Sequence, residues 1–175
     1  DLAIYKKKFG ISPAGRVDVM YYSSSQLMKR ESKVPIFDDG VFSDGKIYVS
    51  TGSPLSGSRM KGMTSRVAAR SVLNEIKACP FWLAECYSLS AGHELKRFGA
   101  PTRPLMTSFA DLAEDFSRAE GTDEFREVYA KLAVTAGFFL QRYGEAKFES
   151  VFARLKAGKS LAEALEAAVG AKIGV

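Results

Sequence analysis

Histidine is nearly absent from this chain, whose 175 residues contain one, His93, with none before it. Catalytic zinc helices that carry two histidines four residues apart are therefore excluded, unless another chain supplies ligands. No apolar run approaches the roughly 20 residues that a membrane-spanning helix needs, so no membrane span is predicted. The chain begins at Asp1, not Met, and we expect a processed product or an excised fragment. Its localisation therefore stays open.

Cysteine is also scarce, with two residues, Cys79 and Cys86. Two cysteines do not define a disulfide framework. Cys79, Cys86 and His93 are spaced seven apart, and on one continuous helix this spacing gives a rise of about 10.5 Å per step. That rise is too long for a shared metal ion or for a disulfide. We predict two free thiols near a buried helix, unless Cys79 lies in a loop that folds back over it.

The chain has no strong excess of either charge. It carries 25 Lys and Arg against 20 Asp and Glu, a formal charge of +5, and its densest basic run is Lys6 to Lys8. Zinc-finger spacing, an RNP signature and a basic heptad repeat are all missing. Apolar residues make up 46% and charged residues 26%, as in ordinary soluble globular proteins. We therefore expect a solvated surface and no nucleic-acid binding.

The first third of the chain predicts short strands and a hairpin. Arg16 to Tyr22 is rich in Val and Tyr and favours a strand, and the serines after it can cap a short helix through Met28. Val41-Phe42 and Ile47 to Val49 flank Asp44-Gly45, a dipeptide typical of tight hairpin turns. One further extended segment and one loop are expected at Val34 to Phe37 and at Thr51 to Ser58.

The rest of the chain predicts helices. Apolar residues recur at helical spacing from about Thr64, and Pro80 suits the start of a second helix. Helix starts and stops are further indicated by two capping boxes and two glycines, at Ser108/Asp111, Ser160/Glu163, Gly144 and Gly170. The predicted fold class is α+β, with a small N-terminal mixed sheet that contains a hairpin, then a central helix pair and a C-terminal helical lobe.

Residues 80–92 carry the most specific pattern, Pro-Phe-Trp-Leu-Ala-Glu-Cys-Tyr-Ser-Leu-Ser-Ala-Gly. This segment resembles the P-x-W-L-x-E-G helix of peptidase MA-like (gluzincin-type) zinc metallopeptidases. Other family-like segments follow the same order along the chain: Gly45-Lys46-Ile47-Tyr48-Val49, Arg142-Tyr143-Gly144, Leu155-Lys156-Ala157-Gly158 and Ala162-Glu163-Ala164-Leu165. The resemblance implies one domain, 1–175, with the sheet and the first central helix in 1–79 and the Glu helix and helical lobe in 80–175.

The resemblance also implies where a zinc site would have been. Glu85 takes the place of the third zinc ligand, and the H-E-x-x-H segment falls on Arg66-Val67-Ala68-Ala69-Arg70, or one or two residues away. A guanidinium has no free lone pair for a metal, and Val67 cannot move a proton. The family's glycine after the third ligand is Cys86 here. We therefore expect a vestigial site formed by Arg66, Val67, Arg70 and Glu85, with no zinc, no cofactor and no catalytic residue.

Glu85 has two interpretations, a surviving ligand or binding carboxylate, and an acid paired with a nearby arginine. Arg66 and Arg70 together carry the charge of the zinc ion that they would replace, so we predict that Glu85 forms a partly buried salt bridge with one of them. The alternative places both arginines on an exposed helix face. His93 begins an H-E-x-x-R sequence that lacks the second histidine, and we predict a surface histidine at a helix end.

Two further expectations concern the cleft and the core. In this family an extended substrate lies along the edge strand before the active-site helix, and the resemblance gives that role to Ile47, Tyr48, Val49 and Ser50, unless the Thr51 to Ser58 loop covers them. Seven large apolar residues at helical spacing should pack between the Glu helix and the helical lobe: Trp82, Leu83, Tyr87, Phe138, Phe139, Phe148 and Phe152.

The sequence therefore predicts a catalytically inactive metallopeptidase-like domain with a polypeptide-binding or assembly role. Its partner would be an extended polypeptide, with an acidic segment preferred, or a partner domain. One alternative is a hydrolase of the peptidase type that uses a non-standard or borrowed metal site. Another is a purely structural domain of a larger polypeptide.

Overall fold

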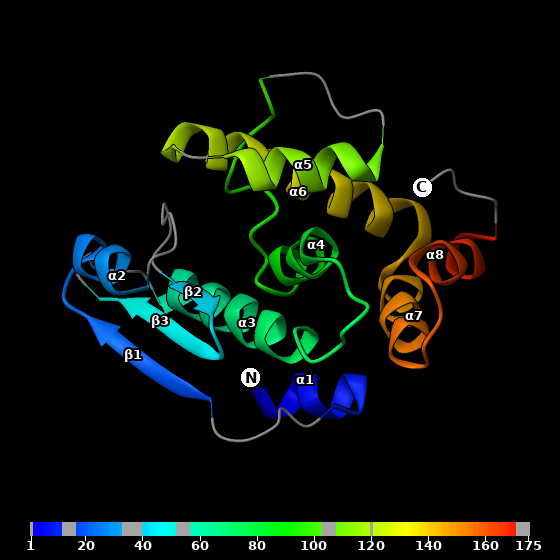
Figure 1. Ribbon diagram of the computed structural model, residues 1–175, viewed down its shortest axis with the longest axis horizontal. Coiled ribbons are helices and arrows are strands. Elements are labelled where there is room, and N and C mark those ends of the chain that lie inside the picture. The colour runs from blue at the N-terminus through cyan, green and yellow to red at the C-terminus, as the bar shows by residue number, and fades with distance from the viewer. Residues whose placement is uncertain are drawn as a thin grey trace.

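A computed structural model describes residues 2–11, 17–32, 40–51, 57–102, 108–119 and 121–170. Its elements in chain order are α1 (Leu2–Phe9), β1 (Asp18–Tyr22), α2 (Ser25–Ser32), β2 (Gly40–Ser43), β3 (Lys46–Ser50), α3 (Gly57–Leu73), α4 (Phe81–Ala91), α5 (Phe109–Arg118), α6 (Thr122–Tyr143), α7 (Glu145–Lys156) and α8 (Leu161–Val169) (Figure 1). A small mixed sheet is thus followed by helices alone, which confirms the predicted α+β class. None of the helices in these ranges is long and apolar enough to cross a membrane.

The sheet has the order β1-β3-β2, with β1 parallel and β2 antiparallel to β3. Asp44 and Gly45 both have positive φ, 48° and 74°, as a two-residue type I′ turn requires. The predicted hairpin is therefore confirmed. The prediction that Ile47 to Ser50 forms an edge strand is wrong, because β3 is the central strand. The tight turn pairs it with β2 on one side, and the connection through α2 brings β1 to the other side.

The helix pair α3–α4 forms the centre of the molecule, with α3 between the sheet and α4 (Figure 1). α3 begins at Gly57, seven residues before the predicted start, because Met60 and Met63 pack with Val49 and extend its apolar face under the sheet. The two backbones touch where α4 ends. A Cβ atom on Gly62 would lie 2.6 Å from the Gly92 carbonyl oxygen, so no larger residue fits there without a shift.

The predicted core is largely present. Trp82, Leu83, Tyr87, Phe148 and Phe152 are all buried in one cluster between α4 and the C-terminal helices. Phe139 is half-buried, and its ring centroid lies 4.7 Å from that of Phe148.

The prediction for Phe138 is wrong, since this side chain is 62% exposed. It follows the buried Ala136 by two residues, which at about 100° per residue places it on nearly the opposite face of α6.

The helix α1 was not predicted. Tyr5 and Phe9 are buried, and the Phe9 ring lies 5.3 Å from the Tyr87 ring and 5.6 Å from the Phe152 ring, centroid to centroid. The signal was the helical spacing of Leu2, Tyr5 and Phe9, which the run Lys6 to Lys8 interrupts.

The predicted helix ends agree better with the structure. Both capping boxes form, and Gly144 and Gly170 take positive φ at the ends of α6 and α8. Val34 to Phe37, and residues 52–56 of the predicted loop, lie outside the described residues.

Candidate functional site

Arg70 and Glu85 form a buried ion pair between α3 and α4. The Arg70 Nε donates a hydrogen bond of 3.0 Å to Glu85 Oε1, and the two residues are 7% and 4% exposed. The Arg70 guanidinium also lies over the Phe81 ring, 4.4 Å from its centroid. The predicted salt bridge of Glu85 with one of the two arginines is therefore present, and it is more deeply buried than expected.

Arg66 reaches a different carboxylate, that of Glu94. Arg66 Nε lies 2.6 Å from Glu94 Oε2, and both residues are buried. Arg66 Nη2 also donates a hydrogen bond of 2.7 Å to the Gly40 carbonyl oxygen, at the start of β2. Gly40 lies close against α3, since a Cβ atom there would lie 2.7 Å from the Met63 side chain. Arg66 thus links the central helices to the sheet.

Glu94 is the residue of the site that sequence reasoning missed. Gly92 ends α4, and His93 then takes a left-handed backbone conformation with φ 56°. This turn lets the Glu94 N–H donate to the Leu89 carbonyl oxygen and directs the carboxylate toward α3. Glu94 Oε1 also accepts a hydrogen bond of 3.1 Å from Arg97. The sequence signal for the pair of Glu94 with Arg97 was their spacing of three residues in the H-E-x-x-R sequence, which is typical of ion pairs within one turn.

His93 itself is exposed at the helix end, as predicted.

Together these five side chains form what we call the arginine network: Arg66, Arg70, Glu85, Glu94 and Arg97. It has two parts, Arg70 with Glu85 and Glu94 with Arg66 and Arg97, so that three guanidiniums face two carboxylates. A guanidinium keeps its proton and cannot act as a base, and both carboxylates accept ion pairs. Val67 packs with Val49 and Met63 under the sheet. The arrangement joins α3 to α4 and to the turn that follows α4 through buried ion pairs.

A metal site is not apparent in the described part of the chain, where no three His, Cys, Asp or Glu side chains lie close enough to hold an ion. Cys79 and Cys86 are free thiols, as predicted. Burial raises the pKa of Cys79 to about 12 and raises that of Cys86 well above its ordinary value. Neither sulfur is therefore a thiolate near neutral pH, which argues against a cysteine nucleophile.

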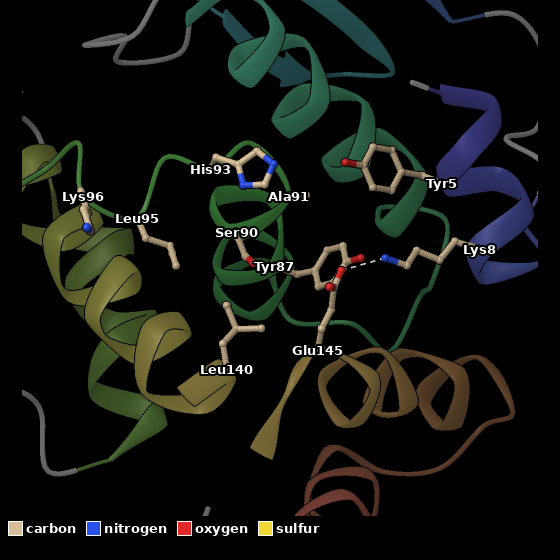
Figure 2. A pocket seen from close by; sticks show the side chains of 10 residues that line it. All are labelled: Tyr5, Lys8, Tyr87, Ser90, Ala91, His93, Leu95, Lys96, Leu140 and Glu145. Atoms are coloured by element: carbon tan, nitrogen blue, oxygen red, sulfur yellow. Dashed lines mark hydrogen bonds and ion pairs between the residues drawn. The ribbon is translucent and has the colours of Figure 1, made fainter. Parts of the chain in front are cut away.

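A cavity of about 590 Å³ lies between α1, α4 and the C-terminal helices (Figure 2). Figure 2 shows Lys8 and Glu145 joined on one side of it, at 2.8 Å, with Leu95 and Lys96 on the opposite side. Lys8 also pairs with Glu149, and Glu149 accepts a hydrogen bond of 3.3 Å from the Tyr87 hydroxyl.

Three ionisable side chains of this cavity, Lys8, Glu145 and Tyr87, each keep one charge state at neutral pH. Burial alone would lower the pKa of Lys8, but its hydrogen bonds to Glu145 and Glu149 outweigh burial and raise it. The hydrogen bond from Lys8 holds the pKa of Glu145 below its ordinary value, and burial raises the pKa of Tyr87. Lys8 and Glu145 therefore stay charged and Tyr87 neutral, so none of them is tuned as a general acid or base.

The structure thus brings Arg70 and Glu85 together, pairs Arg66 with Glu94, and places Val67 in an apolar cluster. Ile47 to Ser50 lie in the middle of the sheet, away from any edge. Comparisons with protein-family models, with curated proteins and with solved structures each found no match to this chain.

Proposed function

We propose that this chain is a non-catalytic domain of the peptidase MA-like type that binds an extended polypeptide or a partner domain. The observation that carries the proposal is the arginine network. At the positions that the resemblance assigns to zinc ligands stand two buried arginines, each paired with a carboxylate. The carboxylate assigned to the third ligand, Glu85, is one of the two.

The charges of the network disfavour a metal ion at this place. A zinc ion beside Arg66 and Arg70 would meet two permanent positive charges in a site of low dielectric, where like charges repel strongly. Breaking either ion pair to free a carboxylate would leave a buried guanidinium without its partner, which costs several kcal/mol. The ion pairs therefore favour a site that stays closed to metal.

A polypeptide-binding role is supported by the exposed strand β1. The resemblance indicates β3 for this role, but β3 is the central strand. β1 lies at the edge of the described sheet, and its residues Val19, Met20 and Tyr21 are 42%, 40% and 71% exposed. Side chains on both faces of the strand are exposed, and no described strand pairs with its outer edge. A free edge can pair with an extended chain through backbone hydrogen bonds, whatever the sequence of that chain.

The backbone direction along β1 identifies which residues face the free edge. The Tyr22 carbonyl oxygen accepts a hydrogen bond of 2.8 Å from the Thr51 N–H, which continues β3, so Tyr22 points inward. Backbone groups alternate along a strand in a parallel pair, so those of Val19 and Tyr21 point outward. A partner strand would therefore bond to Val19 and Tyr21.

Substitution at Tyr21 tests this proposal. Tyr21→Pro removes the outward N–H and leaves the β1–β3 hydrogen bonds in place, while Tyr21→Ala is the matched control that keeps the N–H. Amide-shift titration with a neutral, Thr-rich extended heptapeptide should show binding to the parent and to Tyr21→Ala. Binding by Tyr21→Pro should weaken about tenfold or more, the loss expected when a backbone hydrogen bond cannot form.

Equal binding by all three proteins would contradict edge-strand addition. Elemental analysis of zinc in the same preparation tests the alternative that the domain is a hydrolase. About one zinc ion per chain, together with peptide cleavage that a chelator abolishes, would favour the borrowed-metal hydrolase over a binding domain.

A further inference from the structure

A second hollow, distinct from the β1 edge, lies between the start of α3 and the turn that follows α4. It is an open groove of about 760 Å³, and we call it the basic groove. Its lining includes four basic side chains, Arg59, Lys61, Lys96 and Arg97, and one carboxylate, Glu94. Since the whole chain has a formal charge of only +5, much of its excess positive charge is gathered at this place.

The one carboxylate does little to offset these cations. Glu94 is 7% exposed, and Arg66 and Arg97 both pair with it. Its negative charge is therefore neutralised by these two arginines, while Arg59, Lys61 and Lys96 are exposed to solvent. A concave surface lined by one sign of charge concentrates the electric field and attracts ligands of the opposite sign.

Gly62 and Gly92 both line the groove. The two residues touch there, and a Cβ atom on Gly92 would lie 2.7 Å from the Gly62 carbonyl oxygen. His93 and Lys96 line both this groove and the cavity of Figure 2, so the two hollows adjoin. The combined path is suited to an extended segment more than to a single small anion.

We propose that the basic groove binds an acidic segment of a partner polypeptide, whose carboxylates pair with Arg59, Lys61 and Lys96. The proposal rests on the polypeptide-binding function above and names the class of sequence that the domain selects. Arginine and lysine on a preformed concave surface pair well with Asp and Glu side chains. Single-stranded nucleic acid fits less well, because no Phe, Tyr or Trp among the described residues lines the groove to stack on bases.

Fluorescence anisotropy with two labelled peptides tests the proposal. One is a hexaglutamate peptide and the other its hexaglutamine counterpart, which has the same shape without the charge. The glutamate peptide should bind about tenfold or more tightly, and its affinity should fall as salt rises toward about 0.5 M, because added ions screen the exposed charges.

Two double variants locate the binding. Lys61→Gln/Lys96→Gln removes two exposed groove cations, neither of which has an ion pair within the described residues. Lys29→Gln/Lys147→Gln removes the same charge from exposed positions on α2 and α7 and is the matched control. The groove pair should weaken binding of the glutamate peptide about three- to tenfold, and the control pair less than about twofold. Circular dichroism confirms that both variants stay folded.

Other outcomes would overturn the proposal. Equal losses of affinity in both double variants would show that the net charge of the protein, and not the groove, determines binding. Tighter binding of an oligo-dT of equal charge would assign the groove to nucleic acid. If Tyr21→Pro lost binding of the glutamate peptide and the groove variant kept it, the peptide would bind at β1. That result would contradict the groove proposal but not the polypeptide-binding function. Absence of binding by both the glutamate and the Thr-rich peptides would contradict both proposals.

Discussion

Two clusters of paired charges in this molecule differ mainly in depth. In the arginine network the exposed fractions of Arg66, Arg70, Glu85 and Glu94 are all 7% or less. Lys8, Glu145 and Glu149 form a second cluster between α1 and α7, the Lys8 cluster, in which the side chains of Lys8 and Glu145 are 30% and 60% exposed. The arginine network joins the consecutive helices α3 and α4, whereas the Lys8 cluster joins helices that are far apart in the sequence. Water can replace a lost partner in the second cluster and not in the first, so only the first makes its members depend on one another.

The largest effect is expected for the Arg70–Glu85 pair. Glu85→Gln leaves the Arg70 guanidinium buried without its counter-charge, which should lower the free energy of unfolding by about 3–5 kcal/mol. The double variant Glu85→Gln/Arg70→Met removes both charges and should be more stable than Glu85→Gln alone. Urea denaturation of the parent, both single variants and the double variant measures the coupling. A coupling near zero would mean that this pair contributes no more than a surface ion pair, and the two clusters would then not differ.

A smaller loss is expected at Arg66. In Arg66→Met the Gly40 carbonyl oxygen loses a hydrogen-bond donor, but Glu94 keeps its ion pair with Arg97. We expect a destabilisation of about 2–3 kcal/mol, since one charged partner remains for the carboxylate. Adding Arg97→Met should then enlarge the loss beyond the sum of the two single variants, because Glu94 becomes isolated. Strictly additive losses in urea denaturation would mean that the two arginines do not share Glu94.

The Lys8 cluster should respond weakly. Lys8→Met removes the ion pairs to Glu145 and Glu149 but leaves the carboxylates near water, so the loss should be about 1 kcal/mol or less. The loss should shrink further in high salt, which screens exposed charges. Thermal unfolding at low and high salt measures both. A loss above about 3 kcal/mol that salt does not change would show that this cluster is as dependent on its partners as a buried pair.

The smallest effect concerns acid pH. The folded pKa of Glu145 lies below its ordinary value because Lys8 donates a hydrogen bond to it. A lowered folded pKa stabilises the protein above the unfolded value of about 4.3, and this contribution is lost as the pH falls through the folded pKa. The stability difference between the parent and Lys8→Met should therefore narrow between about pH 5 and pH 3. A difference that widens on acidification would reverse the sign of this linkage.

Features that depend on neighbouring residues in the sequence were predictable. Asp44-Gly45 requires a tight turn wherever it occurs between strands, and Ser108 with Asp111 and Ser160 with Glu163 cap their own helices. The ion pair of Glu85 was predictable for a different reason. Once two central helices were aligned by their motifs, an acid and an arginine that face each other across them had to pair or remain unsatisfied.

The remaining part of the site depends on a contact that no local pattern encodes. Glu94 reaches Arg66 only because Gly62 and Gly92 bring two backbones together and His93 turns the chain with a positive φ. Before folding, Glu94 and Arg97 look like an ordinary exposed pair. Their burial follows from the approach of α3 to α4.

By itself, the sequence determined the α+β class, the hairpin, the two capping boxes and the lack of a second histidine, all of which depend on residue type and short-range geometry. Only the tertiary structure decided that β3 is central, that β1 is the exposed edge, and that Arg66 belongs to Glu94. It also gathered Arg59, Lys61, Lys96 and Arg97 into one groove. These outcomes depend on which distant segments pack together, and packing is set by the fit of whole surfaces, which no single segment specifies.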